Sequence, residues 1–502
     1  MRPTRRQFMG AAGGAMMAGS GMELLAKLGS VSAAEADLPP SLVRLGDDIE
    51  PTVRLIEETP RERVLEEVAS RIRSGLSYRQ VLAALLLAGV RDVQPRPQVG
   101  FKFHAVLVIN SAHLASLNSP DSDRWLPILW AIDRFKSAQA ETEHTSGWRM
   151  SQVNEGKVPH ASKAREAFVA AMDAWDEQAA DVAAAALARS ASRDECFELF
   201  ARYGCRDFRD IGHKAIFVAN SFRTLGAIGW QHAEPVLRSL AYALLKYDGA
   251  NPAKSDDPAD RPGRRNAELL ATIRPDWEDG KPSSQATAHL ISTFRSGSAD
   301  DCPSAVVQAI NDGVSVNSVW DAILAASGEL LMRKTNILTL HSVTSSNALR
   351  FAFKTAATPA TRLMLLLQNA AFLPLFRQAV GKMGDVQVDR FEPEPPDQKQ
   401  SVDDIFATAT HDRMGAARKS LAYLNQGESP EELIRTARRL VFLKGTDAHD
   451  YKFSSAVLED YYHLSPDWRN RYLASSLFYL PSSGAPDTPL LRRMREALAP
   501  PA

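Results

Sequence analysis

The chain has 502 residues, of which 45% are hydrophobic and 24% are charged, a composition typical of a globular protein with a sizeable core. Its 59 basic and 60 acidic side chains nearly cancel, leaving a net charge of −1. No overall field therefore favours nucleic acid or an anionic membrane surface, and polyanion binding is not expected.

The first 36 residues resemble a bacterial twin-arginine export signal. Arg5 and Arg6 are followed by Phe8, by a weakly apolar stretch of glycine, alanine and methionine, and by small residues at 34–36. An amphipathic helix or an unstructured leader is the alternative interpretation. The resemblance implies a partner, the twin-arginine machinery, which exports folded proteins that often carry a cofactor. We then expect residues 37–502 to be periplasmic or extracellular.

The rest of the chain is predicted to be an all-α, multi-helix domain, because apolar residues recur at three- and four-residue spacing and strand-type alternation is scarce. In the segment 59–76, Thr59 and Pro60 suit a helix start, with Glu62 in capping-box position. The segment 77–90 is apolar almost all round and predicts a buried helix. Further helices are predicted over 163–190, 304–313, 318–334, 348–356, 361–380 and 429–444.

Two polar segments, 246–265 and 386–404, are rich in proline and charged residues and are predicted to be surface linkers. Outside the leader, no apolar run approaches the roughly 20 residues of a membrane span, so stable membrane insertion is not expected. The common phosphate-loop, zinc-protease, nucleophile-elbow and dinucleotide motifs do not occur. NADPH use is compatible with the sequence but is not indicated by it.

The three cysteines, Cys196, Cys205 and Cys302, have no CxxC or zinc-type spacing. Cys196 and Cys205 can pair in principle, although buried or free thiols are the simpler expectation. A thiolate metal site is therefore not indicated.

Several of the eleven histidines lie in segments that otherwise look buried. His104 is surrounded by apolar residues in the segment 101–109, and a buried imidazole needs either hydrogen-bond partners or a metal. His144 follows two glutamates at the edge of a Ser-Gly break, where it can be a ligand or simply solvated. His213 opens an apolar helix. For each of them, an ordinary core or surface histidine is the alternative.

Three carboxylates accompany these histidines in the sequence. Asp207 and Asp210 precede His213 and can accept hydrogen bonds from imidazoles, while Glu234 follows His232. We consider all three as candidate proton carriers of a reaction centre. Three tryptophans are candidate walls of a substrate cavity, although a tryptophan in a helical protein is usually core: Trp148, Trp230 and Trp320.

His449 and Lys452 are predicted to share one face of a helix. Gly445 suits the residue after a helix end, and Thr446 or Asp447 suits the cap of the next helix, so the pair lies in its first turns. Residues three apart lie on the same side of a helix. A second pair, Lys334 and His341, is seven residues apart and nearly eclipsed, which makes it a rival.

Lys452 is predicted to meet the positive end of the helix dipole, which disfavours an ammonium. Conversion to a carbamate would reverse the charge of this side chain and supply an oxygen ligand beside His449. Alternatively, Asp447 and Asp450 can offset an ordinary ammonium, or the lysine can reach solvent.

Four short segments resemble parts of the questin oxidase-like family: "FKFHAVLVINSAHL", "GHKAIF", "LHSVTSSNALR" and "DAHDYK". The resemblance implies a helical enzyme that oxygenates or cleaves aromatic polyketide rings, with a non-haem iron held by several histidines and a carboxylated lysine. Carried over by position, the implied metal ligands are the following: His104, His341, His449 and Lys452, with His144 and His213 as additions. The chain departs from the family by having one histidine at "FKFH" and none four residues after His213.

A cluster of neutral imidazoles with one or two oxygen ligands suits Fe(II) or Mn(II) better than calcium or a thiolate zinc site. We therefore expect an Fe(II) oxidoreductase of the mono- or dioxygenase type, acting on a small organic substrate. Two alternatives remain open from sequence. One is a zinc or manganese hydrolase that uses a bound hydroxide, and the other is a helical scaffold or binding protein without a metal.

Overall fold

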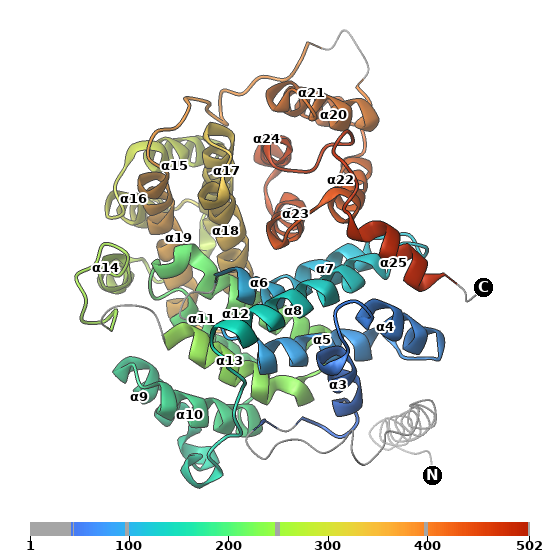
Figure 1. Cartoon of the computed structure of the whole chain (residues 1–502). Coiled ribbons are helices and arrows are strands. Elements are labelled where there is room, and N and C mark those ends of the chain that lie inside the picture. Colours follow the sequence, from blue (N-terminus) through green and yellow to red (C-terminus); the bar gives the residue numbers. More distant parts are fainter. Residues whose placement is uncertain (1–41, 44, 96–99, 246–250, 396–399, 500–502) are drawn as a thin grey trace, which may run out of the picture.

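The computed structural model describes residues 42–43, 45–95, 100–245, 251–395 and 400–499, which form an all-α structure (Figure 1). No strand forms within these ranges, and the isolated bridges Leu42–Ser151 and Lys281–Val314 are their only β-type pairings. The all-α prediction is confirmed. The predicted export signal, residues 1–36, lies outside the described residues.

The helices of the first half are α3 (Glu50–Glu58), α4 (Val64–Arg73), α5 (Tyr78–Asp92), α6 (Gly100–Leu107), α7 (Ile109–Leu117), α8 (Leu126–Thr145), η1 (Glu155–Lys157), η2 (Ala161–Lys163), α9 (Ala164–Ala174), α10 (Glu177–Ser190), α11 (Arg193–Gly204), η3 (Arg209–Gly212), α12 (His213–Ile228), η4 (Trp230–His232) and α13 (Ala233–Leu245).

The helices of the second half are α14 (Arg261–Leu269), η5 (Leu270–Thr272), η6 (Trp277–Asp279), α15 (Ser284–Ser296), α16 (Asp301–Asn311), α17 (Val316–Arg333), α18 (Ile337–Thr355), α19 (Pro359–Val380), α20 (Val402–Thr408), α21 (Arg413–Asn425), α22 (Pro430–Lys444), α23 (Ala448–Asp460), η7 (Tyr461–His463), α24 (Pro466–Ser475), η8 (Ser476–Phe478) and α25 (Leu490–Leu498).

Local signals in the sequence set several helix ends as predicted. In α5, the side chains of Ser77 and Gln80 form a reciprocal capping box, and every residue from 81 to 92 is buried. Gly445 is the C-cap of α22, and Asp447 is the N-cap of α23. His449 and Lys452 therefore do lie in the first turns of α23.

Two helix predictions are wrong in detail. Thr59 is the C-cap of α3, and α4 begins only at Val64 after a turn. The predicted helix 163–190 is split, because Trp175 is left-handed at φ 64° and closes α9, while Asp176 caps α10 through its side chain. The first error thus concerns where a helix begins, and the second concerns a break inside an otherwise continuous apolar pattern.

The two predicted linkers are only partly irregular. Residues 251–260 form turns, but α14 begins at Arg261 inside the first segment. The second segment is irregular where it is described, up to the start of α20 at Val402. Residues 261–265 form the first turn of α14, where proline is well tolerated.

Helix α18 lies at the centre of the packing and contacts α12, α17, α19 and α23 (Figure 1). The C-terminal part of the fold contacts the N-terminal part, since α25 packs on α4 and α8. Contrary to the sequence expectation, one described helix, α19, is long and apolar enough to cross a membrane by length and composition. Its apolar segment is 72% buried inside the fold, as in a core helix.

Candidate metal centre

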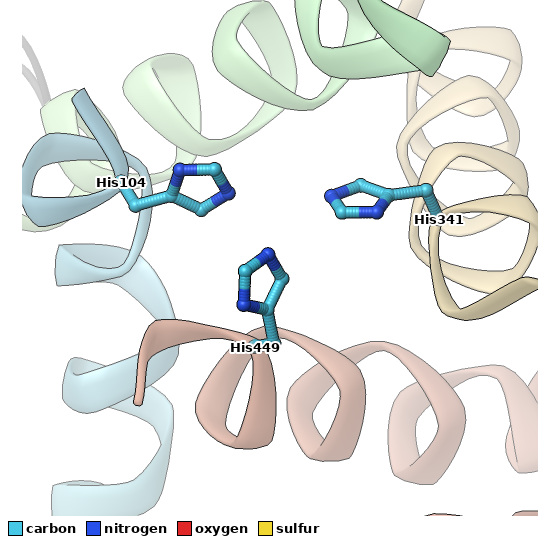
Figure 2. A group of neighbouring side chains, drawn as sticks. All are labelled: His104, His341 and His449. Carbon is cyan, nitrogen blue, oxygen red and sulfur yellow. The ribbon is translucent and has the colours of Figure 1, made fainter. Parts of the chain in front are cut away.

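Four buried histidines from four different helices, one of them α18, meet in the interior of the protein. His104 comes from α6, His213 is the first residue of α12, His341 lies in α18 and His449 lies in α23. Figure 2 shows His104, His341 and His449 pointing toward a common point. Their candidate ligand nitrogens all lie within 4.8 Å of one another. His213 joins this group, with its Nε2 3.1 Å from Nε2 of His104.

Hydrogen bonds on the outer side of the cluster set the tautomers of three imidazoles. His213 donates from Nδ1 to the Asp210 carbonyl at 2.7 Å, and His341 donates from Nδ1 to the Ile337 carbonyl at 2.6 Å. His449 places Nδ1 3.2 Å from the Asp447 carboxylate. Because carbonyls and ionised carboxylates only accept, each Nδ1 carries a hydrogen, and the neutral form of each ring then has its lone pair on Nε2.

The interior position keeps two of the four imidazoles in their metal-binding protonation state. Burial holds the pKa of His213 and of His341 well below the usual histidine range, and the neighbouring Lys452 adds to the effect. The neutral imidazole is the form that binds a metal. These two rings are therefore uncharged ligands at neutral pH.

Lys452 completes the cluster from the next turn of α23. It is buried, and its Nζ donates to Nε2 of His341 at 3.2 Å. Burial lowers the pKa of Lys452 to about 7, although the charges of Asp447 and Asp210 act in the opposite direction. A large share of this amine is therefore uncharged at neutral pH, which is the form able to react with carbon dioxide.

The donor set fits a divalent transition metal. Two nitrogens bound to one ion can be no farther apart than twice the metal–nitrogen bond, about 4.2 Å. The 3.1 Å between His104 and His213 and the 3.2 Å between His341 and Lys452 are within this limit. The ligand nitrogens of His104, His341 and His449 lie within 4.8 Å of one another, so these side chains need at most a small inward movement to share one ion. Imidazole suits zinc, iron and copper alike.

The structure does not bring every predicted site residue to this cluster. His144 is exposed in the last turn of α8, and none of the ring contacts described for the four buried histidines includes it. Glu234 lies near the surface, where its carboxylate pairs with Arg189 at 2.7 Å. The rival Lys334 is exposed, and its Nζ approaches the Lys382 carbonyl rather than His341.

The two predicted aspartates have different places. Asp207 is buried and binds Nζ of Lys214 through both oxygens, at 2.7 and 2.8 Å. Asp210 lies closer to the cluster and contacts His213 through its main-chain carbonyl, while its carboxylate is 3.9 Å from Nδ1 of the same ring. Of the two, only Asp210 therefore contacts a histidine of the cluster directly.

The remaining expectations concern residues outside the cluster. The three cysteines are buried free thiols, as expected. Trp148 packs near Tyr242, and Trp230 packs near Phe222. Trp320 is fully buried against Phe353.

Sequence reasoning named Asp210 as an acceptor for an imidazole, but it missed the other groups that orient the rings. Asp447 was expected only as a cap and a counter-charge, yet it also binds the ring of His449 two residues later. The Asp-x-His spacing at a helix start is a signal that can reveal such a pair. The carbonyls of Asp210 and Ile337 leave no trace in residue types, because every residue has one.

In comparisons with known proteins, the chain matches no family model, no curated protein and no solved structure. The chemistry of the cluster therefore rests on the residues of this chain.

Proposed function

We propose that this protein is a metal-dependent oxidoreductase that holds a non-haem iron and uses dioxygen to oxidise a small organic substrate. The observation that carries the proposal is the convergence of His104, His213, His341 and His449 on one buried point. Three of these imidazoles meet hydrogen-bond acceptors through their outer nitrogens, while the inner nitrogens of the cluster turn toward one another inside the core. A shared cation accounts for this arrangement.

The resemblance to the questin oxidase-like family supports iron and an aromatic, polyketide-like substrate. When bound, iron supplies the one-electron chemistry by which dioxygen oxidises organic molecules. The chain itself holds His213 and His341 neutral, fixes their tautomers and keeps bulk water away by burial. A dry site strengthens the electrostatic interactions within it.

We further propose that Lys452 serves the centre as a carbamate. Its uncharged amine would attack carbon dioxide, form a nitrogen–carbon bond as one carbon–oxygen π bond breaks, and release one proton, so that a neutral amine beside the four histidines becomes a carbamate anion. This change removes the repulsion between a cationic lysine and a metal ion. The position of Nζ beside His341, with a pKa of about 7, supports this step.

The experiment is a measurement of metal content after purification without chelator under low oxygen, for wild type, His341→Ala and His449→Ala. We expect near-stoichiometric iron in wild type and its loss from both variants. His144→Ala is the matched control, because this exposed histidine lies outside the cluster and its loss should leave the metal in place.

Three results would change the proposal. Well-folded wild type that binds no metal, even after reconstitution with iron, would favour the scaffold. Zinc or manganese, together with substrate turnover in the absence of dioxygen, would favour the hydrolase. Metal that persists in both histidine variants would place the binding site elsewhere in the chain.

A further inference from the structure

Three consecutive residues before His213 have left-handed backbones. Asp210 has φ 61°, Ile211 has φ 46° and Gly212 has φ 80°. This conformation is unusual for an aspartate and a strained one for a β-branched isoleucine. Such a turn persists only where surrounding contacts hold it in place.

The turn is what aims His213. The carbonyl that accepts from Nδ1 of His213 belongs to the peptide between Asp210 and Ile211, so relaxation of either residue would rotate it away from the ring. Without this acceptor, the hydrogen could move to Nε2, which would remove the lone pair from the nitrogen that faces His104.

Gly212 sets the distance between His213 and α18. A Cβ at this position would lie 2.6 Å from Cβ of Ser345, which is one turn along α18 from His341. Only glycine allows the start of α12 to approach so closely. The approach brings the rings of His213 and His341 to a centroid separation of 4.3 Å.

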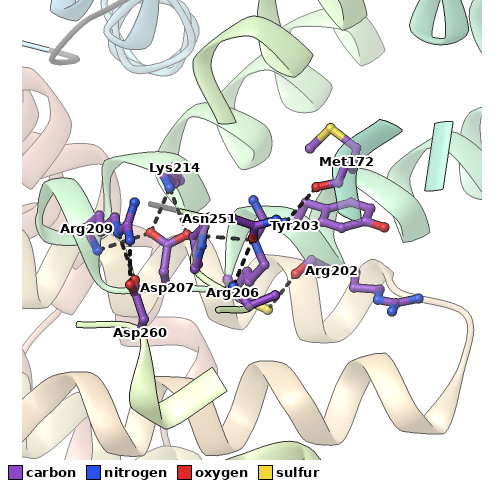
Figure 3. A network of polar contacts seen from close by, with 12 residues as sticks. Met172, Arg202, Tyr203, Arg206, Asp207, Arg209, Lys214, Asn251 and Asp260 are labelled. Atoms are coloured by element: carbon purple, nitrogen blue, oxygen red, sulfur yellow. Dashed lines mark hydrogen bonds and ion pairs between the residues drawn. The ribbon is translucent and has the colours of Figure 1, made fainter. Parts of the chain in front are cut away.

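Two buried ion pairs hold the turn on its outer side (Figure 3). Asp207, before the turn, binds Lys214, after it, and so ties its two ends together. Arg209 binds Asp260 through two parallel hydrogen bonds of 2.8 and 2.5 Å, which anchors the turn to the segment before α14. All four side chains are buried, where breaking such a pair is costly.

We infer that these two ion pairs form a clamp on the left-handed turn 210–212, and that the clamp positions His213 for the metal. Asp207 is therefore a positioning residue that acts through the backbone, and not a proton carrier. This inference rests on the proposed metal centre, but its first readout does not need a metal.

The test is the double variant Asp207→Asn/Lys214→Met, which removes one ion pair of the clamp together with both of its charges, while Arg206, 3.9 Å from Asp207, keeps its own. Nitrogen NMR of labelled histidines in the metal-free protein reports the tautomer of His213. We expect a single Nδ1–H tautomer in wild type and a mixture in the variant. Titration with Co(II) should show a 10- to 100-fold weaker affinity and an altered visible spectrum, as expected when a ligand loses its orienting partner.

The control removes an ion pair elsewhere that is buried on its arginine side, Arg238 with Asp181, as Arg238→Met/Asp181→Asn. It should lose stability without changing the tautomer of His213 or the Co(II) affinity. If the clamp variant does not fold, the double variant Arg209→Met/Asp260→Asn, which removes the other ion pair with both of its charges, provides the same two measurements. An additional test of the close approach is Gly212→Ala, whose effect should be partly reversed by Ser345→Gly.

An unchanged tautomer and a Co(II) affinity within about twofold of wild type in a folded clamp variant would overturn the inference. If wild type binds no Co(II) but the tautomer of His213 changes in the variant, the positioning role stands and the metal proposal fails. If Co(II) binds equally in both and the tautomer is unchanged, the metal proposal stands and the clamp fails.

Discussion

Asp447 serves both a helix and an imidazole. Its carboxylate accepts from the backbone N–H of His449 at 2.6 Å and lies 3.2 Å from Nδ1 of the same residue. Burial opposes ionisation of Asp447, but these hydrogen bonds prevail and lower its pKa. The ionised carboxylate is therefore available to orient the ring of His449 and to make its Nε2 a stronger metal ligand.

Asp447→Asn should separate the two roles. Asparagine caps a helix about as well as aspartate, so the free energy of unfolding should change little. The loss of charge behind His449 should weaken metal binding by about tenfold or more. Titration with Co(II) and urea unfolding measure the two effects.

Asp447→Ala is the companion variant, because it also removes the cap and should cost about 1 kcal/mol of stability. Ser429→Ala, which removes the side-chain cap of α22, is the control for capping alone and should keep full metal affinity. Equal metal affinity in Asp447→Asn and wild type would contradict a role for this carboxylate at the centre.

Helix α23 carries His449 and Lys452 of the cluster near its start and ends with another titratable residue, Asp460. Asp460, its last residue, is fully buried, accepts from Asn347 at 2.9 Å and from the Tyr472 hydroxyl at 3.2 Å. Burial, with a smaller effect of Glu459, raises the pKa of Asp460 to about 7. This helix thus joins α18 and α24 through a carboxyl group that is largely protonated in mildly acidic solution.

The raised pKa of Asp460 predicts a pH dependence of stability. Its unfolded pKa is about 3.9, so between about pH 4 and 7 the folded state binds more protons than the unfolded state. The contribution of this group is therefore fully present below about pH 4 and is lost as the pH rises through about 7, by a few kcal/mol. Asp460→Asn keeps the acceptor for Asn347 and should remove this part of the slope.

The measurement is urea unfolding of wild type and Asp460→Asn at several values between pH 4.5 and 8. As the pH rises, the free energy of unfolding of the variant should increase relative to that of wild type. Glu166→Gln, at an exposed pair with Lys163, is a control that should show no such trend. A constant difference across this range would contradict the protonated state of Asp460.

At the scale of the whole molecule, the candidate centre joins parts of the chain that are far apart in sequence. Its histidines come from α6, α12, α18 and α23, so the site exists only when these helices are packed together. A metal at this point would bind the folded state and not the unfolded chain. Binding energy would then appear as folding stability.

Added metal should therefore raise the unfolding temperature. At a free concentration 100 times the dissociation constant, the expected gain is about 2.7 kcal/mol. The measurement is thermal unfolding with and without Fe(II) under low oxygen. A variant with all four clustered histidines replaced by alanine should show no increase in unfolding temperature. If the unfolding temperature of wild type also does not change with metal, metal binding is not coupled to folding as proposed.

Local chemistry explains what could be predicted from sequence. The apolar periodicity, the cap at Asp447 and the helix end at Gly445 act over a few residues, and a helix places His449 and Lys452 on one face whatever the rest of the chain does. The buried character of α5 also follows from its composition. The split at Trp175 was missed because a single left-handed residue interrupts an otherwise continuous pattern.

The sequence by itself determined the helical class, many helix ends and the pairing of His449 with Lys452, because hydrogen bonds and side-chain spacing within a helix are local. Only the tertiary structure decided that His213 joins the cluster while His144 stays at the surface. It also decided that Asp207 binds Lys214. These contacts depend on how separate helices pack, and the direction of a side chain across such an interface is fixed by the whole core rather than by its neighbours in sequence.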